Sequence, residues 1–319
     1  MSEPARRIAV TGAAGYIGNE LVKRLASTPG VDRVLAIDIR PMQDAVPECV
    51  DFAQQDIAKP FDHLLSANAI DTVVHLAYIL RPGHNRAAIR KINVGGTANL
   101  LTACANAKVK KIVYLSSTSV YGAHPDNPEL LTEDAPTRPV RGFQYSENKA
   151  QAEQLILAYS KRRPGVVTTV LRACPVMGPG ADNFIARAFL KPFLVAAGKA
   201  DPPMQLLHEA DLSSVLARSL AADSPGVYNV AGEGTIRWPE MAAMLKRKVF
   251  HLPPGILYPA TDLLWSLRMQ NESPACGLDF IRYRWTADTE KVKREMGITF
   301  KHTSREAWQA FARRRAGPP

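Results

Sequence analysis

The chain has 319 residues, of which 46% are apolar and 22% are charged, a composition typical of a soluble globular protein with a large core. It has no apolar run of about 18 residues, no apolar signal segment near its N-terminus and no metal-binding spacing among its four cysteines and seven histidines, so we expect a cytoplasmic protein without membrane insertion or a metal site. Lys and Arg number 40 against 30 Asp and Glu, but they fall in short, scattered clusters, so we expect no nucleic-acid partner.

Short β-branched runs alternate with helical patterns along the first half of the chain. The expected strands are residues 6–12, 32–39, 71–78, 110–118 and 166–173. The expected helices lie between them, and the longest are residues 86–107 and 145–160. Because the strands are almost continuously apolar and are separated by helices, the sequence predicts an α/β fold with a doubly wound parallel sheet covered on both faces.

The pattern changes after Pro175, where Gly and Pro become frequent and the alternation of strands and helices weakens. We therefore expect residues 1–175 to form a cofactor-binding domain and residues 176–319 to form mainly a smaller substrate-binding region. Residues 209–233 are expected to return to the first domain, because they end in the strand-like segment VYNVAG. The chain ends in a helical pattern, for which Ser304 is the predicted N-cap.

The first expected strand leads into the segment TGAAGYIGNEL. Gly12, Gly15 and Gly18 between a strand and a helix are typical of a loop that binds a pyrophosphate, because residues without a Cβ let the backbone approach the phosphates at a helix N-terminus. Asp38 ends the second strand about 20 residues further on, where a carboxylate binds the ribose hydroxyls of NAD. Asp38 would repel the 2′-phosphate of NADP, although Arg40 leaves NADP as an alternative. The sequence therefore predicts a Rossmann-type domain that binds NAD.

Further residues in the loop and at the expected strand ends are candidates for contact with the same cofactor. They are Ala14, Tyr16, Ile17, Asp56, Ile57, Leu76 and Ala77. Asp56 and Ile57 are expected near the adenine, and Leu76 and Ala77 near the middle of the cofactor. An ordinary residue at a strand end is the alternative interpretation.

Tyr145 and Lys149 lie four residues apart at the expected start of a helix. One helical turn separates them, so their side chains project from the same face. They are either two solvated residues or a pair for proton transfer, and the spacing alone does not decide between these.

The glycine loop, the carboxylate after the second strand, the segments HLAY and LSSTSVYG and the tyrosine–lysine pair follow one another in a single order. This order resembles the extended short-chain dehydrogenase/reductase superfamily, in its NAD-dependent epimerase/dehydratase branch with UDP-glucose 4-epimerase-like members. The resemblance implies that Tyr145 is the catalytic acid/base, that Lys149 is its electrostatic partner and a ligand of the nicotinamide ribose, and that Ser117 binds the reacting oxygen. It implies a supporting role for Asn93, and a homodimer is expected.

Several residues depart from the family's motifs, and these departures reduce the number of reactions and substrates that we expect. Thr118 and Ser119 replace the acidic pair of sugar-nucleotide 4,6-dehydratases, so we expect no dehydratase activity. Cys174 and Met204, with the residues that follow them, replace the polar groups with which sugar-nucleotide epimerases hold the diphosphate. The candidates for taking over that role are Arg172, Arg187, Lys191 and Lys199. His208 is expected to pack or cap near the following helix.

We therefore predict an NAD-dependent epimerase or oxidoreductase that acts on a secondary alcohol, with a nucleotide sugar as the small-molecule substrate and a 4-epimerase type of reaction. One alternative is an NAD-dependent dehydrogenase of a more apolar alcohol, similar to hydroxysteroid dehydrogenases. The apolar residues 255–269 would then form a wall of the site, whereas our expectation is that they belong to the core. Another alternative is a non-catalytic nucleotide-sensing or RNA-associated relative, against which the intact Ser117, Tyr145 and Lys149 argue.

Overall fold

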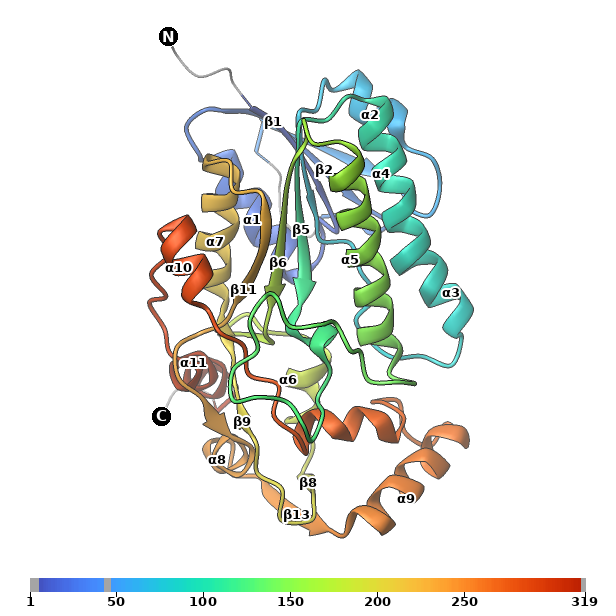
Figure 1. Cartoon of the computed structure of the whole chain (residues 1–319), viewed down its shortest axis with the longest axis vertical. Helices are drawn as coiled ribbons and strands as arrows, with labels where there is room; N and C mark the ends of the chain where they lie inside the picture. Colours follow the sequence, from blue (N-terminus) through green and yellow to red (C-terminus); the bar gives the residue numbers. More distant parts are fainter. Residues whose placement is uncertain (1–5, 43–46, 317–319) are drawn as a thin grey trace.

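The computed structural model describes residues 6–42 and 47–316, and its centre is a seven-stranded sheet in the order β11-β6-β5-β4-β1-β2-β3 (Figure 1). All neighbouring strands in it are parallel. The strands are β1 (Arg6–Thr11), β2 (Val31–Asp38), β3 (Val50–Gln54), β4 (Thr72–His75), β5 (Lys111–Ser117), β6 (Val167–Ala173) and β11 (Gly226–Val230). The strand order reverses between β1 and β4, which creates a crevice where open α/β sheets bind ligands. The predicted doubly wound parallel sheet is confirmed.

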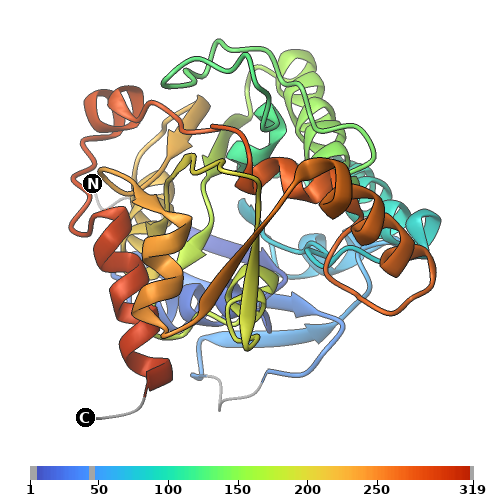
Figure 2. The same cartoon turned by 90° about the horizontal axis from the view of Figure 1, so that it is seen from below.

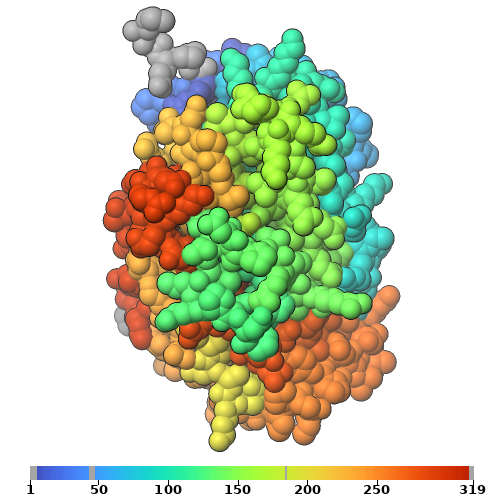
Figure 3. Space-filling model, in the orientation of Figure 1, coloured from blue at the N-terminus to red at the C-terminus, as the bar shows by residue number. Residues whose placement is uncertain are grey.

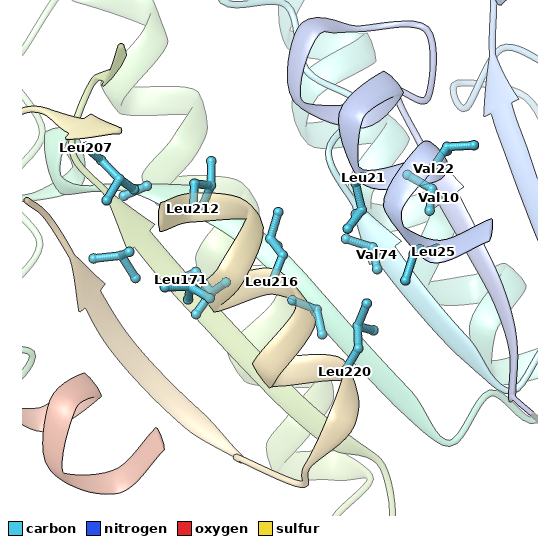
Figure 4. Packing of buried hydrophobic residues seen from close by; sticks show 14 of the residues in the cluster. Val10, Leu21, Val22, Leu25, Val74, Leu171, Leu207, Leu212, Leu216 and Leu220 are labelled. Carbon is cyan, nitrogen blue, oxygen red and sulfur yellow. The ribbon is translucent and has the colours of Figure 1, made fainter. Parts of the chain in front are cut away.

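Helices cover both faces of this sheet. One face carries α1 (Tyr16–Ala26), α7 (Glu209–Ala221) and α10 (Glu290–Met296), and the other carries α2 (Asp62–Ala67), α4 (Gly96–Asn106) and α5 (Gln144–Arg162). Successive strand residues point to opposite faces, so Val74 packs with the first group and Val73 with the second. Figure 4 shows Leu212 and Leu216 of α7 beside Leu171 of the sheet. Burial on both faces explains the continuous apolar runs of these strands.

The helix predicted over residues 86–107 is present and has three parts. A π-helical turn, η1 (Lys91–Gly95), joins α3 (Arg86–Arg90) to α4. The turn points Asn93 inward, where its side-chain amide exchanges hydrogen bonds of 2.8 and 3.1 Å with the backbone of Ile79. Asn93 therefore holds the loop that follows β4, and π turns of this kind are frequent at functional sites.

Apart from α7, β11 and α10, the C-terminal part of the chain lies at the carboxyl ends of the strands (Figures 1 and 2). Short strands pair here as β7 (Val176–Met177) with β10 (Leu207–His208), β9 (Pro203–Met204) with β12 (Ile236–Arg237), and β8 (Phe193–Ala197) with β13 (Lys248–Leu252). The helical elements are α6 (Phe184–Ala188), α8 (Trp238–Met244), α9 (Pro254–Ser266), η3 (Ala275–Ile281) and α11 (Ser304–Ala316). Phe189 and Trp308 lie at the centre of their core, with ring centroids 4.5 Å apart.

The apolar segment 255–269 does not belong to the core, contrary to the prediction. It forms most of α9 and the turn after it, and within it Leu257 is buried, whereas Leu263, Leu267 and Met269 are exposed. Across the part of the chain that the structure describes, no helix combines the length and the apolar character needed to cross a bilayer.

The N-cap of α11 is Thr303 rather than the predicted Ser304. The Thr303 hydroxyl accepts a hydrogen bond from the Glu306 amide at 3.1 Å, and the Glu306 carboxylate accepts one from the Thr303 amide at 2.8 Å, which is a capping box. Ser304 is buried instead, and its hydroxyl accepts a hydrogen bond from the Leu206 amide at 3.1 Å. The prediction was wrong by one residue because both neighbours carry a hydroxyl that can cap.

Candidate active site

The glycine loop connects β1 to α1 in a geometry that needs glycine. Gly12 has a φ of +74°, and a Cβ there would lie 2.7 Å from the amide nitrogen of Ala77. A Cβ on Gly18 would collide with the carbonyl oxygen of Gly12. Gly15 is the N-cap residue of α1 and supplies no side-chain cap, so the first turn of α1 presents amides to an anion.

Asp38 ends β2 beside this loop, and its side chain is buried. One carboxylate oxygen accepts a hydrogen bond from the Ala14 amide at 3.0 Å, and the other accepts one from the Arg40 amide at 3.0 Å. The Arg40 side chain is exposed, and its Nε lies 3.8 Å from the carboxylate. A carboxylate held against the loop fits the ribose hydroxyls of a bound NAD, with the loop itself holding the pyrophosphate.

The remaining predicted cofactor residues lie at the start of α1 or just beyond the carboxyl ends of β3 and β4. They are Tyr16, Ile17, Asp56, Ile57, Leu76 and Ala77. Ala77 adjoins the glycine loop, because its amide donates to the Thr11 hydroxyl at 3.3 Å. Asp56 closes a turn by accepting a hydrogen bond from the Ala58 amide at 2.8 Å. The contact of these residues with the cofactor stays a prediction.

His75 ties the end of β4 to its neighbours through a buried chain of hydrogen bonds. Its Nδ1 lies 2.7 Å from the Thr11 hydroxyl, and its Nε2 lies 3.1 Å from the Thr97 hydroxyl. Because the Thr97 hydroxyl donates to the Asn93 carbonyl and the Thr11 hydroxyl accepts from the Ala77 amide, a neutral imidazole with its proton on Nε2 satisfies every partner. Burial lowers the pKa of His75 to about 3, so the ring stays neutral.

The predicted catalytic residues meet at the carboxyl end of β5. Ser117 ends this strand and is the N-cap residue of the 3₁₀ turn η2 (Thr118–Tyr121). Tyr145 and Lys149 lie one turn apart near the start of α5. Lys149 is buried, and its Nζ donates a hydrogen bond of 2.7 Å to the carbonyl of Leu115, two residues before Ser117. The helix and the strand thus hold the lysine in a fixed position.

Burial and neighbouring polar groups set the protonation of this pair. Burial raises the pKa of Tyr145, and the nearby hydroxyls of Ser117 and Ser119 act in the opposite direction. Burial lowers the pKa of Lys149 to about 7, against the effect of the Glu153 carboxylate. An ammonium on Lys149 favours a phenolate on Tyr145, because opposite charges stabilise each other where water is excluded.

Tyr78 touches both catalytic candidates, a role that the sequence analysis did not predict. The Lys149 ammonium lies 3.9 Å from the centroid of the Tyr78 ring. The Tyr78 hydroxyl donates a hydrogen bond of 2.9 Å to the Tyr145 carbonyl, and the two tyrosine rings meet edge to face at 5.6 Å. The signal in the sequence was HLAY, whose aromatic residue follows a strand that ends at the cofactor site.

The turn after Ser117 offers a polar atom that the sequence analysis did not assign to the site. Thr118 Oγ1 is buried and has no hydrogen-bond partner among the described residues. A buried hydroxyl without a partner is costly, so a ligand oxygen that pairs with it would be stabilised.

Arg172 is not a free phosphate ligand, which corrects one of the four candidates. Its guanidinium forms a buried ion pair with Glu153 at 2.6 Å and donates to the Tyr121 hydroxyl at 2.7 Å. Arg187 and Lys191 pair with carboxylates as well, Arg187 with Asp182 at 2.8 Å. The contacts of Arg172, Arg187 and Lys191 therefore do not support a role for these residues as replacements for the diphosphate anchors.

His208 caps the helix that follows it, as predicted. Its Nδ1 accepts a hydrogen bond from the Ala210 amide at 3.2 Å at the start of α7, and its ring stacks on His302 with centroids 3.8 Å apart. His208 is thus part of the packing between α7 and the chain before α11.

The family match and a similar structure solved with NAD support an NAD-dependent enzyme of the oxidoreductase type. A profile of the NAD-dependent epimerase/dehydratase family matches residues 8–231, and the chain belongs to this family, as the resemblance predicted. NAD is therefore the cofactor, in agreement with the prediction from the glycine loop and Asp38.

Several known proteins are similar to the chain. An uncharacterised protein of Mycobacterium tuberculosis (strain H37Rv) is 31% identical over 323 residues, which cover 98% of this chain and 85% of the relative. A UDP-glucose 4-epimerase of Lactobacillus helveticus is 33% identical over 184 residues, or 56% of this chain and 54% of that enzyme. The structure of MoeE5 with UDP-glucuronic acid and NAD has a TM-score of 0.76 at 26% identity and covers 97% of this chain and 99% of its own.

Proposed function

We propose that the chain is an NAD-dependent 4-epimerase of a nucleotide sugar, which oxidises a secondary alcohol and reduces the ketone again on its other face. The observation that carries this proposal is the meeting of Ser117, Tyr145 and Lys149 at the carboxyl end of β5, in the sheet that also carries the glycine loop. The similarity to a UDP-glucose 4-epimerase and to MoeE5, which was solved with UDP-glucose and with UDP-glucuronic acid, supports the substrate class.

Each catalytic residue has a chemical task in this reaction. When bound, NAD accepts a hydride from the carbinol carbon and gives it back. Tyr145 as a phenolate accepts the proton of the substrate hydroxyl and later returns it to the same oxygen. Lys149 as an ammonium stabilises that phenolate, and the Ser117 hydroxyl holds the reacting oxygen.

The experiment first denatures the purified protein and measures the NAD and NADH that it releases. UDP-glucose and UDP-galactose are then offered separately to the native protein. We expect their interconversion without net NADH, because an epimerase returns the hydride that it removes. Steady accumulation of NADH would contradict the proposal and indicate a dehydrogenase.

A matched pair of variants tests the role of Tyr145. Tyr145→Phe should lower kcat by at least about 100-fold, since it removes the proton acceptor, and should leave the NAD content unchanged. Tyr228→Phe serves as the control, because the Tyr228 hydroxyl donates to the Pro225 carbonyl at the amino end of β11, whereas the candidate site lies at the carboxyl ends of the strands. Turnover by Tyr145→Phe at the rate of this control would disprove the mechanism.

A dehydrogenase of a more apolar alcohol is the second candidate, and the diphosphate positions favour it. Met204 is buried, and the Gln205 side chain already bonds both the amide and the carbonyl of Ala287, at 2.7 and 3.1 Å. Neither position offers a free polar group to a diphosphate. Oxidation of apolar secondary alcohols with accumulation of NADH, together with indifference to both UDP-sugars, would select this candidate.

A further inference from the structure

α9 has two apolar faces, and the described chain covers one of them. Leu257 is buried, and Trp265 stacks on His84 with ring centroids 4.3 Å apart, so this face rests on the protein. The adjacent face carries apolar side chains at positions i, i+4, i+7, i+8 and i+11, the spacing of one helical stripe. They are Ile256, Ala260, Leu263, Leu264 and Leu267. Leu263 and Leu267 are each 60% exposed.

The strand that leads into α9 continues the exposed apolar surface. Phe250 of β13 and Phe193 of the neighbouring β8 are 51% and 53% exposed, with their rings edge to face at 5.6 Å. We call this surface the α9–β13 patch and define it by Phe193, Phe250, Ile256, Leu263, Leu267 and Met269. It lies at the bottom of Figures 1 and 3. Exposed apolar surface of this extent usually marks an interaction site.

Positive charges are interleaved with this patch. Residues 241–270 contain Lys246, Arg247, Lys248 and Arg268, against Asp262 as the single carboxylate. Lys248 pairs with Phe193 in the β8–β13 register, and alternation along the strand puts Lys248 and Phe250 on one side. Arg268 lies between the exposed Leu267 and Met269. The partner of the patch must therefore accept apolar side chains and cations together.

We propose that the α9–β13 patch binds the surface of membranes that contain anionic lipids. α9 itself has no Lys or Arg, but a helix can lie in the interface with its apolar side chains in the boundary between headgroups and acyl chains while the flanking Lys248 and Arg268 attract the anionic headgroups. A second copy of the chain fits less well, because a symmetric contact would bring two such basic surfaces together. The inference concerns a surface outside the catalytic site and does not rest on the proposed function.

The contacts of α9 connect this surface to the rim of the candidate active site. Besides the stacking of Trp265 on His84, Arg81 Nε donates to the carbonyl of Asn271 at 3.4 Å. His84 and Arg81 belong to the loop that follows β4, and this loop starts next to Tyr78. Protein bound through the patch would therefore hold its active site close to the lipid surface.

Co-sedimentation with vesicles tests the proposal on the full chain. The vesicles are made of phosphatidylcholine alone or of phosphatidylcholine with phosphatidylserine, and binding is measured across a salt series. We expect binding to the anionic vesicles that weakens with salt, and little binding to the neutral ones. Two double variants, Leu263→Glu/Leu267→Glu and Lys248→Glu/Arg268→Glu, should each lower the partition coefficient for anionic vesicles by at least about 10-fold.

Matched controls separate the patch from general effects of charge. Leu130→Glu changes an exposed leucine elsewhere, and Lys161→Glu changes an exposed lysine at the end of α5. Both should bind as the unchanged protein does, and thermal unfolding followed by circular dichroism should show that all variants fold. Absence of binding to anionic vesicles at low salt would overturn the proposal, as would equal binding by patch and control variants. The proposal would also be overturned if the protein binds no vesicles and instead sediments as a dimer that Leu263→Glu/Leu267→Glu abolishes and the other variants do not. The patch would then bind a second copy of the chain.

Discussion

The aromatic ring of Tyr78 positions Lys149, the lysine of the proposed mechanism. An ammonium over a ring in a dry site is stabilised by up to about 2 kcal/mol, which favours the charged form of Lys149. Tyr78→Leu removes the ring, so the pKa of Lys149 should fall further below its present value of about 7. The alkaline limb of the pH profile of kcat/KM should then move to lower pH by about one unit.

Tyr78→Phe is the matched control for this prediction. It keeps the ring and loses the hydrogen bond to the Tyr145 carbonyl, which contributes about 1 kcal/mol to stability. The alkaline limb of the pH profile of kcat/KM should stay at the same pH for this variant, while its melting temperature falls slightly. Superimposable pH profiles for Tyr78→Leu and the unchanged protein would show that the ring does not act on Lys149.

Asp38 should determine the choice between NAD and NADP. Its carboxylate is held against the loop by the amides of Ala14 and Arg40, where it would face the adenosine ribose. Asp38→Asn keeps the shape and removes the charge, so we expect NAD affinity to fall by about 10-fold and the preference over NADP to shrink. Calorimetry with both cofactors measures this, with Arg40→Ala as the comparison. Tighter binding of NADP by the unchanged protein would reverse the assignment and make Arg40 a phosphate ligand.

The residue types of the site were predictable, whereas their mutual contacts were not. Gly12, Asp38 and Ser117 stand at or next to a strand end, and the Tyr145–Lys149 pair stands one turn apart at a helix start, so the sequence pattern indicates each of them. Tyr78 also follows a strand, in the segment HLAY, but this position does not determine whether its ring points to solvent, into the core or into the site. Its role depends on how the loop after β4 is held by Asn93, which is a contact between distant segments.

At the level of elements, the ion pair of Glu153 and Arg172 links α5 to β6 within the core. Their closest atoms are 2.6 Å apart, and both side chains are almost fully buried. Glu153→Gln leaves the guanidinium without its counter-charge, so we expect a loss of about 3–5 kcal/mol in the free energy of unfolding. The control Asp126→Asn breaks an exposed pair with Arg138 and should cost less than about 1 kcal/mol. Urea denaturation measures both, and equal losses would contradict the role of the buried pair.

His75 should make the link between β1, β4 and α4 sensitive to acid. The pKa of the ring is about 3 in the folded chain and near 6.5 when unfolded, so between these values the unfolded chain binds a proton that the folded chain does not. The stability from the neutral ring is therefore present above pH 6.5 and is lost as the pH falls, by about 1.4 kcal/mol per unit down to about pH 3.

The variant His75→Gln isolates this contribution from other titrating groups. It has no imidazole, so its disadvantage in stability relative to the unchanged protein should be largest at pH 7 and should shrink at pH 6 and pH 5. Urea denaturation at these three pH values gives the comparison. A constant difference would show that His75 titrates alike in the folded and unfolded chains.

A strong hydrophobic periodicity made most helices and strands predictable. Where this periodicity is absent, the prediction failed. The strands of the sheet that are apolar on both faces were predicted to within a few residues. β3 was not predicted, because its sequence VDFAQ is short, mixed and at the edge of the sheet. α9 was expected in the core, since composition alone does not distinguish an apolar segment that packs inside from one that faces a partner.

At the scale of the whole molecule, the division at residue 175 does not coincide with an independent core. α7 and β11 come from the second half of the chain, yet Leu216, Tyr228 and Val230 share one apolar cluster with Val10 and Leu171. Both elements fall within residues 209–233, which the sequence predicted to return to the first domain, and the packing joins both halves of the chain on one face of the sheet.

A fragment of residues 1–175 should consequently fail to fold, although it contains every predicted cofactor and catalytic residue. It lacks β11, which pairs with β6, and it lacks the carbonyls of Leu220 and Ala222, to which the buried ammonium of Lys111 donates at 3.3 and 2.7 Å. An exposed strand edge and an exposed apolar face favour aggregation. We expect no cooperative transition in urea and no NAD binding by calorimetry, whereas the full chain should show both. A cooperative transition with NAD affinity like that of the full chain would mean that the first 175 residues are a domain in the thermodynamic sense, and that the contacts of α7 and β11 add little to the sheet.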